Sequence, residues 1–351
     1  MPRSVFGRLF RRPARRMASR PEPATRTHVI LLDGTMSSLE PGWETSIGLI
    51  YRYLDRETRH DIYYEPGIEW RGWRNVGEVM AGVGINHQIR RSYGVLAERW
   101  RPGDRIFLMG FSRGAYAVRA LAGMIDRVGL LRPEHASDAS VQDVYDHYRQ
   151  GPITPEARSF AARFCHSRVE VTAIGVFDTV QAVGIRWPLL WRLFPVVHAF
   201  RSHRLGQTVG HGFHALALDE TRLAYRADRW RTRGARTGSV EQVWFRGTHG
   251  DIGGQVKGCD RCRPLANVPL VWMLERLSGV GLDLPGDWRV HFPCDAEAPS
   301  VGNWRGFGKI FLTRARRKVG MDPSEAIHPT AEAHRAAGKL RTYDGQTGIA
   351  S

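Results

Sequence analysis

Short apolar segments alternate with glycine-containing turns and helical stretches along most of the chain. The clearest buried strand is His28–Leu32, a β-branched and apolar run that ends at Asp33. Further strands are expected over Asp61–Glu65, Arg105–Met109, Val169–Phe177 and Gln242–Phe245. Helices are expected over Ile85–Trp100, Ala115–Val128, His211–Tyr225 and Leu265–Leu277. This alternation predicts an α/β fold with a mainly parallel sheet flanked by helices.

We expect one large domain over residues 27–335, with two small domains as the alternative. Two insertions, at about residues 131–168 and 184–240, are expected to form a helical cap. Trp187–Phe200, which is rich in tryptophan and leucine, is part of that cap, a lipid-facing surface or an ordinary packed segment. Residues 1–26 are expected to form a disordered basic arm and residues 336–351 a flexible tail.

The charge balance narrows the classes of ligand. The chain carries 51 basic and 35 acidic residues, and all but four of the basic residues are arginine. Guanidinium groups bind phosphate through paired hydrogen bonds, so this balance favours an anionic substrate or peripheral contact with an anionic membrane; a solvated basic surface is the alternative. Nucleic acid is not expected, because the arginines are scattered and do not lie on one helix among stacking aromatic residues.

The cysteines and the N-terminal arm bear on the compartment. Four cysteines are too few and too unevenly spaced for a disulfide framework in 351 residues, which favours a reducing compartment. Residues 1–26 lack the apolar stretch of a signal peptide, and Trp187–Phe200 is too interrupted to span a bilayer. We therefore expect a cytoplasmic protein, with export by a leaderless route as the alternative.

The segment Gly110-Phe111-Ser112-Arg113-Gly114 has the pattern of a nucleophile elbow. Such a turn requires glycine on both sides of the serine, because a strand must bend sharply into a helix while the serine adopts a strained conformation. Here the pattern follows an apolar strand and opens a helix, which favours Ser112 as a nucleophile. The alternative is a tight turn in which Ser112 only caps the helix.

A serine nucleophile needs a base that is held by a carboxylate. Asp178 and His249 each follow a predicted strand, in the chain order serine, acid, histidine that α/β-hydrolases use. Asp178 as a helix cap is the alternative assignment. His328, His214 and His211 compete with His249; the strongest competitor, His328, follows no clear strand. The predicted triad is therefore Ser112, Asp178 and His249, and it requires no cofactor.

The oxyanion of an acyl-transfer reaction needs two backbone amides. We predict one from Arg113, the residue after the nucleophile, and a second from Gly34 or Thr35 in the turn after the first strand. Asp33-Gly34-Thr35 is also similar to the aspartate loop of phosphatases that form an aspartyl-phosphate. Those enzymes carry a second aspartate two residues earlier, where this chain has Leu31, so the phosphatase assignment is disfavoured.

Cys259 and Cys262 have the C-x-x-C spacing of half a zinc site. Without a second pair the spacing is weak evidence, and using His249 as a ligand would remove the triad base. We therefore expect a loop with free thiols and no metal. A metal-dependent hydrolase that uses Cys259, Cys262 and Asp251 is the alternative.

Eight motifs in order carry a resemblance to a known family. They are Asp33-Gly-Thr35, Tyr64-Glu-Pro-Gly67, Pro102-Gly-Asp104, Gly110-Phe-Ser-Arg-Gly-Ala-Tyr116, Arg119-Ala-Leu-Ala-Gly-Met-Ile125, Phe177-Asp-Thr-Val180, His214-Ala-Leu-Ala-Leu-Asp-Glu220 and Gly247-Thr-His-Gly-Asp-Ile-Gly-Gly254. From about residue 26 to 335 the chain resembles the uncharacterised α/β-hydrolase family that includes the type VI secretion phospholipase effectors of the first lipase class. It departs from that family at Phe177, Gly250 and Gln255, which bears on pocket shape.

The resemblance implies a phospholipase or related esterase that hydrolyses acyl esters of glycerophospholipids, with Ser112, Asp178 and His249 at the triad positions. We also assign Asp33 and Asp251, which lie in two of the motifs, as substrate-binding residues. The competing function is a non-catalytic or regulatory module on the same fold that binds anionic lipid through its arginines.

Overall fold

The computed structural model describes residues 25–67, 83–180, 203–234, 238–304 and 312–336. Within them, seven strands form one sheet in the order β2-β1-β3-β4-β5-β6-β7. The strands are β1 (Thr27–Leu32), β2 (Asp61–Glu65), β3 (Arg105–Phe111), β4 (Val171–Phe177), β5 (Val209–Ala217), β6 (Ser239–Phe245) and β7 (Glu325–Ile327). All neighbouring pairs are parallel, so the carboxyl ends of the strands lie along one edge of the sheet. The predicted α/β fold is confirmed.

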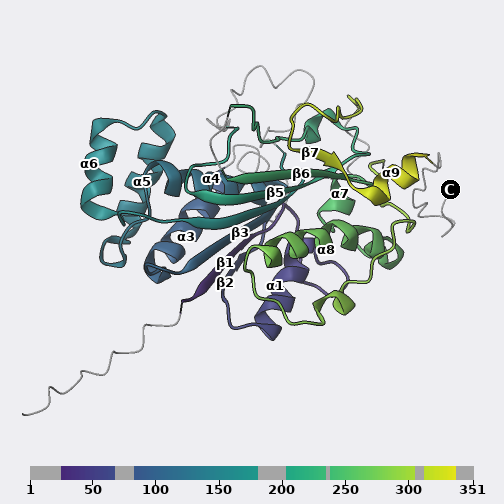
Figure 1. Cartoon of the computed structure of the whole chain (residues 1–351), viewed down its shortest axis with the longest axis horizontal. Coiled ribbons are helices and arrows are strands. Elements are labelled where there is room, and N and C mark those ends of the chain that lie inside the picture. Colours follow the sequence, from purple (N-terminus) through teal and green to yellow (C-terminus); the bar gives the residue numbers. More distant parts are fainter. Residues whose placement is uncertain (1–24, 68–82, 181–202, 235–237, 305–311, 337–351) are drawn as a thin grey trace, which may run out of the picture.

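Helices cover both faces of this sheet (Figure 1). The described helices are α1 (Ser46–Glu57), α3 (Val83–Arg99), α4 (Arg113–Arg127), α5 (Asp138–Gln150), α6 (Pro155–Phe164), α7 (His249–Ile252), α8 (Arg263–Gly279) and α9 (Pro329–Ala336). Side chains of α3, α4 and α5 share one buried cluster with the sheet. Side chains of α1 and α8 share another. The sheet therefore separates two hydrophobic cores.

Strand β1 shows why both faces are buried. Ile30 and Leu32 belong to the cluster with α3 and α4, whereas Val29 and Leu31 belong to the cluster with α1 and α8. Successive side chains of a strand point to opposite faces, so a continuous apolar run fits only a strand that is covered on both sides. This pattern is the one expected of a parallel sheet between two layers of helices.

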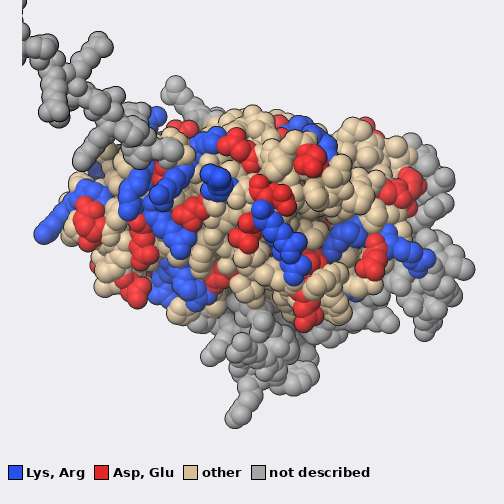
Figure 2. Space-filling model, turned by 90° about the horizontal axis from the view of Figure 1, so that it is seen from below, with Lys and Arg blue, Asp and Glu red and all other residues tan. Residues whose placement is uncertain are grey.

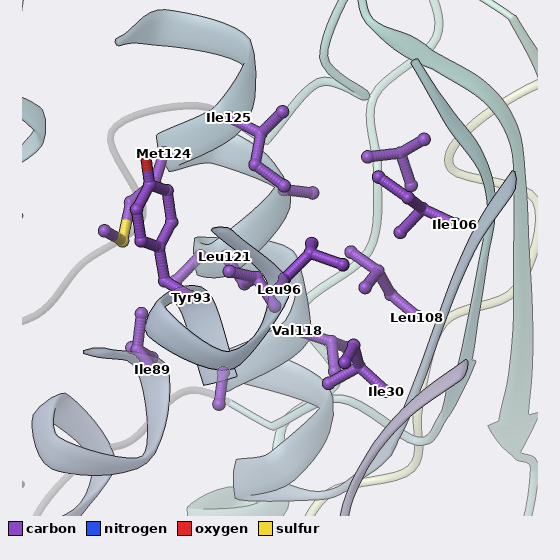
Figure 3. Packing of buried hydrophobic residues seen from close by; sticks show 14 of the residues in the cluster. Ile30, Ile89, Tyr93, Leu96, Ile106, Leu108, Val118, Leu121, Met124 and Ile125 are labelled. Atoms are coloured by element: carbon purple, nitrogen blue, oxygen red, sulfur yellow. The ribbon is translucent and has the colours of Figure 1, made fainter. Parts of the chain in front are cut away.

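The cluster on the α3 and α4 side is tightly interdigitated (Figure 3). Leu96 from α3 and Val118 from α4 point toward Ile106 and Leu108 of β3. Complete burial of such a side chain contributes about 1.5–3 kcal/mol. Since β3 and α4 flank Ser112 directly, this packing holds the two arms of the predicted elbow in place.

The helix predicted over His211–Tyr225 is wrong. Val209–Ala217 is strand β5, between β4 and β6, and only a short 3-10 turn follows at Leu223–Tyr225. This segment mixes glycine and histidine with apolar residues, and it is too short for its pattern to distinguish a buried strand from a buried helix. In the structure Gly212 pairs with Ile174 and Val240 on the two neighbouring strands, so the ladder and not the local pattern decides the conformation.

The predicted helical cap requires two corrections. The segment 184–240 is not an insertion throughout, because it contains β5 and the first residues of β6. Helices α5 and α6 do lie within 131–168, but they extend the helical layer at the end of the molecule away from α7 (Figure 1). The suggested cap at Trp187–Phe200, the basic arm up to residue 24 and the tail after residue 336 lie outside the described residues.

The surface seen in Figure 2 carries basic and acidic side chains side by side, and the basic ones do not form one uninterrupted patch. In the described part of the chain, no helix is both long enough and apolar enough to cross a bilayer. Beyond Asp295, where the sequence is weakly patterned, the structure adds β7 and α9 to the sheet edge and its flank.

Candidate active site

Ser112 occupies the turn between β3 and α4. Its backbone angles, φ 56° and ψ −116°, are those of a strained residue, and its side chain makes no capping hydrogen bond to α4. A Cβ on Gly110 would lie 2.5 Å from the carbonyl oxygen of Gly114, and one on Gly114 would lie 2.0 Å from that of Leu32. Both glycines are therefore required by close backbone contacts, and Ser112 is not a simple helix cap.

The structure brings Ser112, His249 and Asp178 together. His249 Nε2 lies 2.9 Å from Ser112 Oγ, and His249 Nδ1 lies 2.7 Å from Asp178 Oδ2. The first distance fits donation by the serine hydroxyl to the ring, and the second fits donation by the ring to the carboxylate. Asp178 follows β4 and His249 follows β6, so the parallel sheet explains why residues so distant in sequence meet.

The Asp178 carboxylate is fully buried and accepts hydrogen bonds on both oxygens. Oδ1 accepts from the Ala217 amide at 3.1 Å and from Arg317, and Oδ2 accepts from His249 and from the second Arg317 nitrogen at 3.0 Å. Burial by itself raises the pKa of Asp178, but the Arg317 guanidinium and His249 outweigh it and hold the pKa well below the ordinary value. The carboxylate therefore stays ionised.

The His249 ring is fixed by its loop and by two aromatic neighbours. The His249 amide donates to Glu220 Oε2 at 3.2 Å, and the rings of Phe111 and Tyr225 lie 4.8 Å from the imidazole. Glu220 is itself held by the Arg222 guanidinium at 2.7 Å, and Arg222 lies 3.8 Å from the centre of the Tyr225 ring. This arrangement leaves the imidazole little freedom to rotate away from Ser112.

Asp251 links the loop that carries His249 to the segment at Ser300 and Val301. Its Oδ2 accepts from the Thr248 amide and from the Ser300 hydroxyl, and its Oδ1 accepts from the Val301 amide. The residue is fully buried, and burial raises its pKa despite these hydrogen bonds. Asp251 thus anchors the loop that carries His249, and its role in binding substrate stays a prediction.

Asp33 plays a similar part on the other side of the site. Its Oδ1 accepts from the Gly34 amide at 2.6 Å, and its Oδ2 accepts from Thr45 Oγ1 at 2.7 Å and Tyr64 OH at 3.0 Å. Burial raises the pKa of Asp33 to about 6. Both oxygens face protein donors, so Asp33 shapes the turn after β1; its role in binding substrate stays a prediction.

These contacts also separate the two predicted oxyanion residues of that turn. The Gly34 amide donates its hydrogen bond to Asp33. The Thr35 amide, which is next along the loop, is therefore the better candidate for an oxyanion donor. A Cβ on Gly67 would lie 1.8 Å from the Gly34 carbonyl oxygen, and Gln255 donates to the Thr35 carbonyl at 3.1 Å. The carbonyl groups before and after the Thr35 amide are therefore both in contact with other segments. Arg113 begins α4 directly after Ser112.

The competing histidines lie elsewhere. His328 does follow a strand, β7, contrary to the expectation, but its Nδ1 pairs with Thr330 Oγ1 at 2.8 Å. His214 is buried, accepts from the Thr179 amide at 3.1 Å, and has a pKa that burial lowers to about 3. His211 pairs with Ser239. The strand before His328 was not predicted, because a strand of three residues leaves almost no pattern in the sequence.

The cysteine pair also differs from the expectation. Cys259 and Cys262 form a disulfide, where free thiols were expected. The described residues hold no group of three or more histidine, cysteine or acidic side chains that could bind a metal ion. Both cysteines are buried in a small cluster with Val256 and Val301, beside the loop that carries His249.

Comparison with known proteins gives the family. Residues 26–276 match the family described as the catalytic domain of type VI secretion phospholipase effectors of the Tle1-like kind. The chain belongs to this family. The matched region contains β1 to β6 and all three residues of the Ser112, Asp178 and His249 cluster.

An uncharacterized protein from Saccharomyces cerevisiae is 32% identical over 220 residues, which are 55% of this chain but only 31% of the yeast protein. Among solved structures, an uncharacterized protein from Pseudomonas aeruginosa has a TM-score of 0.42 at 15% identity, over 77% of this chain and 49% of that one. The Tle1 effector bound to the VgrG spike has a TM-score of 0.37 at 19% identity, over 66% of this chain and 51% of that one. The chain thus spans about half or less of each of these relatives.

Two residues of the site were missed from the sequence. Glu220 ends the motif His214–Glu220. Its position directly after an apolar segment could have indicated that its carboxylate lies near the site. Arg317 lies in a basic run, Arg314–Lys318, where each arginine has the same local signal. Only the fold selects the one that reaches Asp178.

Proposed function

We propose that this Tle1-like catalytic domain is a serine hydrolase that cleaves the acyl ester bonds of phospholipids or related esters. The observation that supports this most is the unbroken path from Ser112 Oγ to His249 and on to Asp178, with separations of 2.9 Å and 2.7 Å. These separations are within hydrogen-bond reach, as a nucleophile and its base require.

In the proposed reaction, Ser112 Oγ attacks the ester carbonyl carbon while its proton moves to His249 Nε2. The carbonyl oxygen becomes an oxyanion that accepts hydrogen bonds from the Arg113 and Thr35 amides. Asp178 accepts from His249 Nδ1 and stabilises the imidazolium. The C–O bond to the leaving alcohol then breaks, and His249 returns the proton to that alcohol.

Water completes the cycle. His249 takes a proton from a water molecule, whose oxygen attacks the acyl carbon and releases the fatty acid from Ser112 Oγ. The Ser112 hydroxyl regains its proton from His249, so the enzyme is regenerated. No step of this scheme uses a cofactor.

A lipid substrate fits two features of the chain besides its family. Basic residues exceed acidic ones by 16, which suits a phosphate headgroup or an anionic surface. Near the triad, Leu223 is 40% exposed and lies two residues before Tyr225, which contacts the His249 ring. We infer peripheral contact with anionic membranes, for which sedimentation with phosphatidylglycerol vesicles, weakened by salt, is the expected result.

Labelling with a fluorophosphonate tests the triad directly, because the reagent modifies only an activated serine. The wild type should label, and Ser112→Ala should not. Ser278→Ala, an exposed serine of α8, is the matched control and should label like the wild type. Failure of the wild type to label would favour the non-catalytic lipid-binding module.

The product analysis identifies the bond. Wild-type protein incubated with mixed phospholipid vesicles should release fatty acid and lysophospholipid, and Ser112→Ala should release neither. Activity that survives Ser112→Ala but is lost to a chelator would instead support the metal-dependent hydrolase.

A further inference from the structure

Arg317 contacts the predicted acid of the triad and lies outside residues 26–276, the part of the chain that matches the family. We propose that Arg317 is a positioning residue of the active site, which fixes the Asp178 carboxylate toward His249. The proposal rests on the proposed hydrolase function.

The contact is a two-point clamp. Arg317 Nη1 donates to Asp178 Oδ1 at 2.5 Å, and Nη2 donates to Asp178 Oδ2 at 3.0 Å. A planar guanidinium facing a planar carboxylate through two parallel hydrogen bonds fixes the rotation of the carboxylate, which a single bond would not. Asp178 Oδ2 is the same atom that accepts from His249, so the clamp controls the geometry of the triad itself.

The arginine is held as firmly as the carboxylate that it binds. Nη1 also donates to the Ala217 carbonyl at 3.0 Å, and Nη2 also donates to the Tyr225 carbonyl. The side chain is 7% exposed. Its backbone segment is tied to the loop after β5, since Leu223 donates to Thr313 and Ala315 donates to Thr221. Arg317 thus joins the end of β5, the Tyr225 loop and Asp178 into one unit.

The clamp has an electrostatic consequence for the reaction. In a triad the negative aspartate stabilises the imidazolium that forms when the histidine takes the serine proton. Here the Arg317 guanidinium helps to hold the pKa of Asp178 below its ordinary value, so the carboxylate is ionised and oriented when that imidazolium forms.

Two substitutions separate the charge from the geometry. Arg317→Met removes both, and Arg317→Lys keeps the charge but cannot form the two parallel hydrogen bonds. The measurement is the second-order rate of fluorophosphonate labelling at neutral pH. It needs no knowledge of the natural lipid. Arg276→Met is the matched control, because Arg276 also pairs with a carboxylate, Glu241, but near the amino end of β6 and so at the opposite end of the strand from His249.

We expect Arg317→Met to label about tenfold to a hundredfold more slowly, because a small misplacement of a catalytic group has that effect. Arg317→Lys should also be slower, because lysine cannot form both hydrogen bonds. In a third variant, Arg317→Ala, guanidinium ion should restore part of the rate, which a purely structural role would not predict. Arg276→Met should match the wild type in rate.

A folded Arg317→Met that labels at the wild-type rate overturns the proposal. If neither Arg317→Met nor Arg317→Lys folds, Arg317 acts in stability alone and the proposal is likewise overturned. A wild type that does not label rejects the hydrolase function itself, and that result is distinct from both of the others.

Discussion

Replacing Asp33 with asparagine isolates what it costs to bury a carboxylate beside the predicted oxyanion turn. Asp33 is 1% exposed, and burial raises its pKa from 3.8 to about 6. Asparagine has the same shape, its oxygen can still accept from the Gly34 amide, and the hydroxyls of Thr45 and Tyr64 can rotate to accept from its NH₂ group. The substitution therefore removes the charge while it preserves the packing.

The direction in which stability changes with pH follows from the direction of the pKa change. Below 3.8 the carboxyl is neutral in both the folded and the unfolded state, and above about 6 it is charged in both, so the folded state bears the full cost of burial. The stability that the neutral form supplies is thus lost as pH rises through this window. Because one pKa unit corresponds to about 1.4 kcal/mol, the full loss is about 3 kcal/mol, of which about 2 kcal/mol falls between pH 4 and pH 8.

The assay is urea unfolding of the wild type and Asp33→Asn at several pH values from 4 to 8. The free energy of unfolding of the variant, relative to the wild type, should increase by about 2 kcal/mol over this range. Asp322→Asn is the control, because hydrogen bonds from Thr232 and Ser324 outweigh burial and lower the pKa of Asp322 to about 2. Its difference from the wild type should stay nearly constant. A change for Asp33→Asn below about 1 kcal/mol, near the error of the extrapolation, would refute the reasoning.

Three further substitutions test the rest of the site. Asp178→Asn should slow fluorophosphonate labelling by about 10⁴-fold and lower stability by about 3–5 kcal/mol, because it leaves the buried Arg317 guanidinium unpaired; a variant as stable as the wild type in urea would contradict this. Gly114→Ala should abolish labelling and lower the Tm, since its Cβ would lie 2.0 Å from the Leu32 carbonyl, whereas Gly286→Ala, with open space around it, should change neither. Glu220→Gln should slow labelling about tenfold because the His249 loop loses a charged acceptor; an unchanged rate would show that the loop holds itself.

The order of elements was largely readable from the sequence. β1 and β3 are apolar runs followed by a glycine turn, and their conformation follows from local composition. The elbow was predictable for the same reason. Gly110 and Gly114 are required by close contacts with the backbone of Gly114 itself and of Leu32, at the end of the neighbouring strand β1. The order serine, acid, histidine then selected Asp178 and His249.

Local patterns failed where a tertiary partner decides the structure. Most of β5 was predicted as a helix, because a short segment of mixed composition suits either state until β4 and β6 supply hydrogen bonds on both sides. The donors that surround Asp33 and Asp251, such as Thr45 and Ser300, come from other segments, so no local pattern predicted these contacts.

What the sequence determined by itself is therefore the α/β fold and the identity of the three residues of the predicted triad, because each has a local signal at the end of a strand or turn. The tertiary structure alone decided which side chains support them. Arg317 reaches Asp178 only because the chain beyond Asp295 returns along the Thr221–Tyr225 loop. The sequence around an arginine in a basic run does not show which carboxylate it pairs with, since an ion pair depends on distance in space and not on separation in sequence.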